Sequence, residues 1–314
     1  MSEKKAVQFR KANRTAYRYQ NLKYCLKCGT YSVLRDKKCF VCGHDDRFTG
    51  MDKLADIVTG RRYRTELCLL ISLFGAGIIA ANNITQIIAT LVAFTVFIVM
   101  FCKIKKYYHL SELKNNLLTI FKKNYSEIKS GLDLDTQSCD EDIKGQNYKE
   151  AYEKLRYIGH LLTGDDKKIQ KLICLDKFII RKDMDLDIDS LLLSDYNLGL
   201  VYFIYEVSKV NRSLINSKVI DYAIKYEDEI LNLENGKEIL GSIAGAVLKI
   251  KNHVSTYKDF LLRYLKYMRK ERILRLCKLL KLYYTDEWED LLKETKRVIG
   301  DMYYGDPEFK EYAG

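Results

Sequence analysis

Four of the nine cysteines lie within eighteen residues of one another and have the spacing of metal ligands. Cys25 and Cys28 belong to one Cys-x-x-Cys-Gly sequence, and Cys39 and Cys42 belong to a second, ten residues further on. Two tight turns with this spacing supply four thiolates to a tetrahedral zinc ion, and the glycine after each pair permits a positive φ. The pattern predicts a closed, structural zinc site.

The alternatives for these cysteines are a redox-active pair of dithiols and a site for a different metal. His44 lies close enough in the sequence to compete with a cysteine as a ligand. The remaining cysteines are scattered through apolar or helical sequence: Cys68, Cys102, Cys139, Cys174 and Cys277. This distribution is not that of a disulfide framework, so we expect a reducing compartment.

Residues 21–50 resemble the short bacterial zinc-ribbon family in their two Cys-x-x-Cys-Gly sequences. The resemblance implies a metal held between two small β-hairpins, with four ligands: Cys25, Cys28, Cys39 and Cys42. It covers only about 25 of the 314 residues and implies nothing about the rest of the chain.

The residues around these cysteines are basic and aromatic, and a basic tail at residues 1–20 precedes them. We expect a binding surface formed by Lys23, Lys27, Tyr31, Arg35, Lys37 and Lys38. Such a surface can hold nucleic acid through phosphate contacts and stacking. Anionic lipid head groups attract the same side chains near a bilayer, and we favour lipid over a protein partner or nucleic acid.

Residues 67–102 contain no charged side chain. One helix of this length would be roughly 54 Å long, far more than the ~30 Å core of a bilayer. Asn82, Asn83 and Gln86 divide the stretch near its middle, which predicts a two-helix transmembrane hairpin. A buried hairpin in a soluble core is the alternative. A pore would need several copies of the chain, and the two segments lack the ionisable residues that ion pathways usually use.

Basic residues flank the apolar stretch on both sides. Residues 1–66 carry 16 Lys and Arg against 7 Asp and Glu, and residues 103–130 carry 7 against 2. The nearest charges are Arg61, Arg62, Arg64, Lys103, Lys105 and Lys106. The turn between the two segments is uncharged, so the positive-inside rule places both ends of the hairpin in the cytoplasm. We expect a multi-pass protein of the cell inner membrane.

The rest of the chain has helical patterning, and its single proline favours long helices. We expect a juxtamembrane linker or helix at 51–66, a basic juxtamembrane helix at 103–130 and an acidic, exposed linker at 131–145. A cytoplasmic α-helical domain should occupy 146–314. Its apolar spacing indicates an irregular bundle or a short stack of helix pairs, although no fixed repeat period is present.

We found no catalytic motif in the helical region. The alternating aspartates of residues 183–190 lack the glycine and glutamate of a calcium loop, and residues 241–245 lack the spacing of a nucleophile elbow. We therefore expect a mainly α-helical bacterial scaffold, not an enzyme, that binds a protein partner at the membrane. The alternatives are an oligomerising membrane effector of a defence or toxin system and a membrane-tethered nucleic-acid-binding protein.

Overall fold

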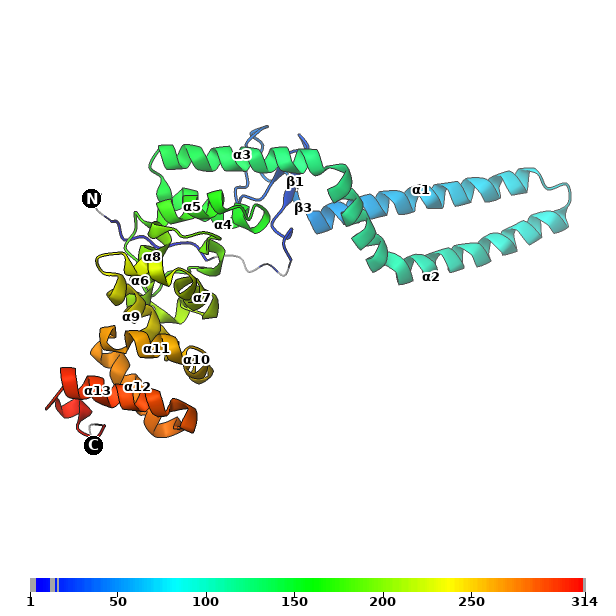
Figure 1. Ribbon diagram of the computed structural model, residues 1–314. Helices are drawn as coiled ribbons and strands as arrows, with labels where there is room; N and C mark the ends of the chain where they lie inside the picture. The colour runs from blue at the N-terminus through cyan, green and yellow to red at the C-terminus, as the bar shows by residue number, and fades with distance from the viewer. Residues whose placement is uncertain (1–3, 12–14, 16, 313–314) are drawn as a thin grey trace. The chain divides into compact units, whose positions relative to one another are not determined.

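The computed structural model describes residues 4–11, 15 and 17–312 (Figure 1). The described residues fall into two compact units, one within Asn13–Glu141 and one within Met1–Ala12 and Asp142–Gly314. We call the first the hairpin unit and the second the helical unit. Helices dominate both, as the sequence predicts.

The hairpin unit consists of a small sheet and long helices. Its three antiparallel strands have the order β2-β1-β3, and the pairing aligns Tyr24 with Tyr31 on one side and with Thr49 on the other. The elements are β1 (Lys23–Cys25), β2 (Tyr31–Ser32), β3 (Phe48–Gly50), α1 (Met51–Ile79), α2 (Ile84–Lys123) and α3 (Tyr125–Lys144), of which α3 extends into the helical unit.

Helices α1 and α2 pack against each other as an antiparallel hairpin, with the turn at residues 80–83. Near the turn, the rings of Phe74 and Phe94 lie 5.0 Å apart. Towards the sheet, the Asn116 amide nitrogen donates to the Thr59 hydroxyl at 2.8 Å. The polar residues at 82–86 therefore coincide with the turn between the two helices, while the membrane crossing stays a prediction.

In the described ranges, α2 alone is long and apolar enough to cross a membrane, and its apolar window is not buried. Helix α1 does not qualify because its last eighteen residues include Arg62, Arg64 and Glu66. Its charge-free part, Leu67–Ile79, would be about 20 Å long.

The expectation of an exposed linker at 131–145 is wrong. This segment continues α3, which buries Gly131, Leu132, Asp135, Ser138 and Cys139. The physical reason is that apolar side chains with helical spacing outweigh the acidic residues between them, of which Asp133 and Glu141 are exposed while Asp135 is buried. The helix expected at 103–130 is also divided, because α2 ends at Lys123 and α3 begins after Asn124.

The helical unit contains ten α-helices among its described residues (Figure 1). They are α4 (Tyr148–Leu161), α5 (Asp165–Leu175), α6 (Leu198–Val210), α7 (Ser217–Lys225), α8 (Glu227–Leu231), α9 (Gly236–Val247), α10 (Lys251–Thr256), α11 (Lys258–Tyr264), α12 (Lys270–Tyr283) and α13 (Glu289–Met302). Short 3₁₀ helices connect them: η1 (Asp189–Leu191), η2 (Arg212–Leu214), η3 (Leu265–Tyr267), η4 (Asp286–Trp288) and η5 (Pro307–Phe309).

Helices α4 and α5 lie at one end of this unit and α12 and α13 at the other, with α6 to α11 between them (Figure 1). Polar contacts join successive layers at similar sequence separations. Tyr226 donates to the Ser194 carbonyl, 32 residues away, Tyr257 donates to Asp221 over 36 residues, and Trp288 donates to Ser255 over 33. The unit is thus a stack of helical layers. The separation varies from layer to layer, which explains why the sequence has no fixed period.

The tail expected at 1–20 is only partly described, since residues 1–3, 12–14 and 16 lie outside the described ranges. Residues 4–11 belong to the helical unit. Phe9 is buried, with its ring 4.7 Å from that of Tyr152 and 5.5 Å from that of Phe178, and Lys5 pairs with Phe178 through a parallel β-bridge. This part of the tail is therefore packed into the helical unit.

Candidate metal centre

The two Cys-x-x-Cys-Gly sequences fold into the same tight turn. The amide of Gly29 donates to the Cys25 carbonyl at 2.9 Å, and that of Gly43 donates to the Cys39 carbonyl at 2.8 Å. The φ angles of these glycines are 78° and 68°, in the left-handed region that side chains with a Cβ disfavour. Strand β1 ends at Cys25 and so delivers the first thiol to the site.

The four thiols converge on one point. The Sγ atoms of Cys25, Cys28, Cys39 and Cys42 all lie within 4.8 Å of one another. Cys25 and Cys42 are 3.8 Å apart at sulfur, and Cys28 and Cys39 are 3.5 Å apart. A disulfide would need about 2.05 Å, whereas a tetrahedral metal with ~2.3 Å bonds to sulfur needs sulfur atoms roughly 3.8 Å apart. The four cysteines can therefore hold one metal ion.

The thiols differ in their electrostatic environment. Burial raises the pKa of the Cys39 thiol to about 12. At Cys28 burial acts in the same direction, but hydrogen bonds from the hydroxyl and backbone of Thr30 outweigh it and lower the pKa of this thiol to about 6. Metal binding requires all four sulfur atoms as thiolates, and the charge of the ion supplies the stabilisation that Cys39 lacks.

His44 does not join the sulfur cluster in the described part of the chain. Its Nδ1 lies 2.8 Å from the Cys42 carbonyl oxygen, and its Nε2 lies 2.5 Å from the amine of Lys27. The four thiols thus have no competing ligand in His44, and four sulfur ligands leave no open coordination position for a reacting water.

Within the hairpin unit, the sheet and the two Cys-x-x-Cys-Gly turns pack closely against α3. A Cβ added at Gly131 would lie 2.2 Å from the backbone oxygen of Tyr31, so only glycine permits this approach. The Asn124 amide donates to the Tyr31 hydroxyl at 2.6 Å. We call residues 21–50 the ribbon. The hollow that remains between the ribbon and α3 has a volume of about 20 Å³, which is enough for one water molecule and too small for a substrate.

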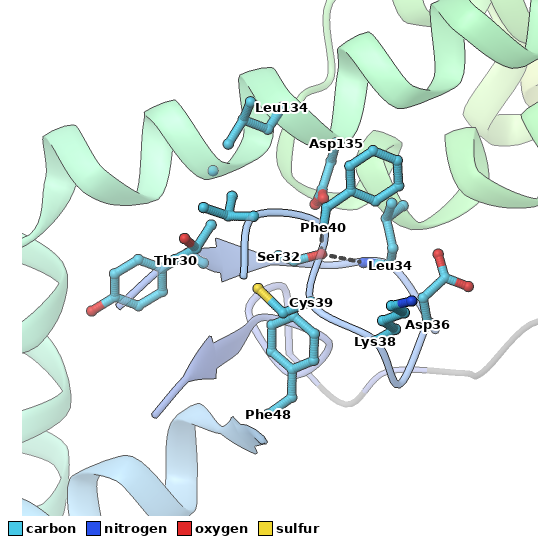
Figure 2. A pocket seen from close by; sticks show the side chains of 13 residues that line it. Thr30, Ser32, Leu34, Asp36, Lys38, Cys39, Phe40, Phe48, Leu134 and Asp135 are labelled. Carbon is cyan, nitrogen blue, oxygen red and sulfur yellow. Dashed lines mark hydrogen bonds between the residues drawn. The ribbon is translucent and has the colours of Figure 1, made fainter. Parts of the chain in front are cut away.

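Asp135 fastens α3 to the loop after β2. Its carboxylate accepts a hydrogen bond from the Val33 amide at 2.8 Å. It accepts another from the Ser32 hydroxyl, also at 2.8 Å (Figure 2). The residue is buried, and burial raises its pKa to about 6, although both hydrogen bonds and the charge of Lys23 act in the opposite direction. Sequence reasoning missed this residue, because we assigned it to a linker. The signal that could have found it is the helical spacing of Ile128, Leu132 and Cys139 around it.

We expect Asp135→Ala to destabilise the hairpin unit by about 1–3 kcal/mol, because the buried Val33 amide loses its acceptor. Asp135→Asn keeps an acceptor and removes the charge, so it should change the free energy of unfolding little.

The pKa of Asp135 is higher in the folded state than the ordinary value of ~3.9. Asp135 therefore contributes stability at low pH that is lost as pH rises through about 6. Urea unfolding at pH 5.5 and 7.5 tests this. The free energy of unfolding should fall more between these two pH values in the unmodified chain than in Asp135→Asn, and an equal fall in both would contradict the prediction.

The expected binding surface of the ribbon is corrected at Tyr31, which is 1% exposed and faces the protein interior. Aromatic side chains in such a short sheet are needed for its own core. Lys23 is also engaged: its amine donates to the Asp36 carbonyl and lies 5.0 Å from the centre of the Phe48 ring.

The other members of that set lie on the exposed side of the ribbon, among acidic residues. Lys37 is within 4.0 Å of Asp46, and Lys38 pairs with Asp45 through a β-bridge. Arg35 is exposed as well, and Lys27 contacts His44. Asp46 lies beside Lys37 and the backbone pairing places Asp45 opposite Lys38, so acidic residues interrupt this basic surface.

The six basic residues next to the apolar stretch lie on α1 and α2 at the end of the apolar segment opposite the turn. Arg61, Arg62, Arg64, Lys103 and Lys106 are exposed. Lys105 differs, because its amine pairs with Glu66 at 2.7 Å and with Glu112 at 2.6 Å. Its charge is therefore neutralised locally, and the interhelical pair with Glu66 joins α1 to α2 just outside the apolar segment.

Comparison with known proteins adds no family to this picture. No protein-family model, no curated protein and no solved structure matches the chain.

Proposed function

We propose that this protein is a membrane-anchored scaffold. The apolar hairpin inserts into a lipid bilayer, the four cysteines hold a zinc ion that folds the ribbon, and the helical unit binds a protein partner. The observation that carries the proposal is the exposed apolar surface of the hairpin: Leu73 is 71% exposed, Ile84 76% and Ile88 57%. A continuous apolar surface of this kind is covered by lipid or by another apolar partner.

The lengths of the two helices support insertion as a hairpin. The apolar part of α2, Ile84–Cys102, would be about 28 Å long, close to the ~30 Å bilayer core. The apolar part of α1 is shorter, and the uncharged turn at 80–83 extends it. The exposed basic side chains at the other end can reach the phosphate level of the lipid, and by the positive-inside rule they place this end in the cytoplasm.

Zinc is the metal that best fits the site. Four thiolates at tetrahedral spacing are a typical ligand set for structural zinc, and a site closed in this way stabilises a fold and does not activate water. The ribbon has few apolar residues of its own, so the ion would provide much of its folding energy.

The layered architecture of the helical unit supports partner binding. Stacked helical layers present extended surfaces, which such proteins commonly use to bind other proteins. The last layers carry exposed apolar side chains, with Leu282 70% and Tyr304 93% exposed. A scaffold of this type needs no catalytic group.

Charge placed on the lipid-facing side of α2 tests the anchoring. Val92 and Val96 are each 60% exposed. Val92→Arg with Val96→Arg should prevent insertion, because each arginine costs about 2.5–3.5 kcal/mol near the centre of a spanning helix. Leu118→Arg is the matched control, since Leu118 is 56% exposed on the same helix beyond the apolar segment. Carbonate-resistant membrane association should be lost in the double variant and kept in the control; an unmodified chain that is soluble without detergent would refute anchoring.

Site-specific crosslinking in native membranes tests the scaffold. A photo-crosslinking side chain at Leu282 or Tyr304 should trap one discrete protein partner. The same group at Tyr125, which is 69% exposed in the hairpin unit, is the control. Crosslinks only between copies of this chain, together with loss of membrane potential on overexpression, would instead favour the oligomerising effector.

A further inference from the structure

A basic groove lies across the helical unit, between the layers that contain α6, α9 and α12. It has a volume of about 490 Å³, within the usual range for sites that bind small molecules. Five cationic side chains line it, and no lining residue is acidic: Lys182, Arg212, Lys249, Arg272 and Arg275. These residues come from four separate segments of the chain, so the charge cluster is created by the fold.

Arg272 is the most constrained of these side chains. Its Nε atom is buried and has no hydrogen-bond partner among the described residues. The side chain crosses α9 at Gly245, where an added Cβ would lie 2.9 Å from its Cγ. Burial lowers the pKa of Arg272, and the neighbouring charge of Arg212 lowers it further. A guanidinium group is therefore held, partly desolvated, next to another of the same sign.

The protein supplies little negative charge to this cluster. The one ion pair described for the five residues joins Arg212 to Glu271 at 4.0 Å, and the Glu271 side chain is 76% exposed. An exposed pair at this distance contributes little. Burial lowers the pKa of Arg212 as well, and the nearby carboxylate of Glu271 only partly offsets this. The groove thus keeps several cations close together without an equivalent counter-charge.

The chemistry of the groove defines its ligand. Guanidinium groups bind phosphate oxygens through paired, charge-assisted hydrogen bonds, and several of them together favour a ligand with more than one phosphate. Val210, Ala246 and Leu248 add apolar surface to the same groove, which suits a ligand with a less polar portion. We propose that the groove formed by Arg212, Lys249, Arg272 and Arg275 binds a small ligand with two or more phosphoryl groups, such as a nucleotide. This site is separate from the metal ribbon and goes beyond the scaffold role.

Calorimetry on the full chain in phosphatidylcholine nanodiscs tests the proposal, with ATP, inorganic tripolyphosphate and adenosine as probes. ATP and tripolyphosphate should bind and adenosine should not, and binding should weaken with added salt. Arg272→Gln should weaken ATP binding by about tenfold or more, as expected for hydrogen bonds between charged groups. Lys278→Gln, on the same helix outside the groove, should leave it within about twofold.

Arg275→Gln is the second variant, because Arg275 is exposed and its replacement should leave the fold intact. Nanodiscs with a phosphoinositide distinguish the source of the phosphate groups. If tripolyphosphate competes with phosphoinositide discs for the same arginines, the groove also accepts phosphate groups from a lipid head group and the phosphate site stands. Binding of long nucleic acid alone, or absence of binding in all arms, would overturn the proposal. It would also be overturned if Arg272→Gln and Arg275→Gln both bound ATP as tightly as the unmodified chain does.

Discussion

Removal of the metal is expected to unfold the ribbon and to release it from α3. Chelation should make all four thiols of Cys25, Cys28, Cys39 and Cys42 reactive and should open residues 21–50 to protease. The expected effect is large, because binding of a structural zinc ion contributes about 10–16 kcal/mol in small metal-folded domains. Elemental analysis before chelation should find one zinc ion per chain, and alkylation followed by mass spectrometry reports the exposed thiols.

Cys39→Ser should reproduce the effect of the chelator, since Cys39 is the buried thiol whose sulfur lies 3.5 Å from that of Cys28. Cys68→Ser is the matched control, because Cys68 is exposed on α1 and outside the cluster. It should retain both the metal and the protease resistance of the ribbon. A chain that contains no metal yet keeps the four thiols protected would contradict the structural role.

Gly131→Ala is expected to push α3 away from the ribbon. The new Cβ would lie 2.2 Å from the Tyr31 carbonyl oxygen, and because that atom belongs to the backbone of β2, no side-chain rotation relieves the overlap. Overpacking of this kind costs about 1–3 kcal/mol. Hydrogen exchange should report faster exchange at the Val33 amide, which donates to Asp135.

The same substitution at Gly60 is the control. Gly60 lies inside α1 in the same unit, and an added Cβ would meet nothing within 4 Å. Gly60→Ala should therefore stabilise the helix by about 0.5–1 kcal/mol, as alanine does relative to glycine. If both variants had the same effect, the close approach between α3 and the ribbon would not be important for stability.

The cluster of four cysteines and the turn between α1 and α2 could be predicted from the sequence because their signals are local. A Cys-x-x-Cys-Gly sequence defines its own turn, and the polar residues at 82–86 coincide with the turn between α1 and α2. Contacts between residues far apart in the chain have weaker signals in the sequence. Gly131 and Asp135 act on residues about a hundred positions earlier, and nothing in the acidic sequence around them indicates that partner.

The burial of Tyr31 was the other error, and two further features were only partly foreseen. Tyr31 was assigned to a binding surface because basic and aromatic residues alternate there, yet a sheet this small needs its aromatic rings as core. Residues 4–11 were assigned to a basic tail, and nothing in that assignment indicated that Phe9 packs into the helical unit. The helical unit agrees with the expected irregular stack of helix pairs, and no fixed period could be found because the sequence separation between its layers varies.

The junction between β3 and α1 has a mechanical consequence. Strand β3 ends at Gly50 and α1 begins at Met51, so no residue lies between the sheet beside the four cysteines and the first helix of the hairpin. Met51 and Ala55 are buried, which clamps the start of that helix. A change in the orientation of the ribbon would therefore change the orientation of α1, and a displacement of α1 would be transmitted to the ribbon in the same way.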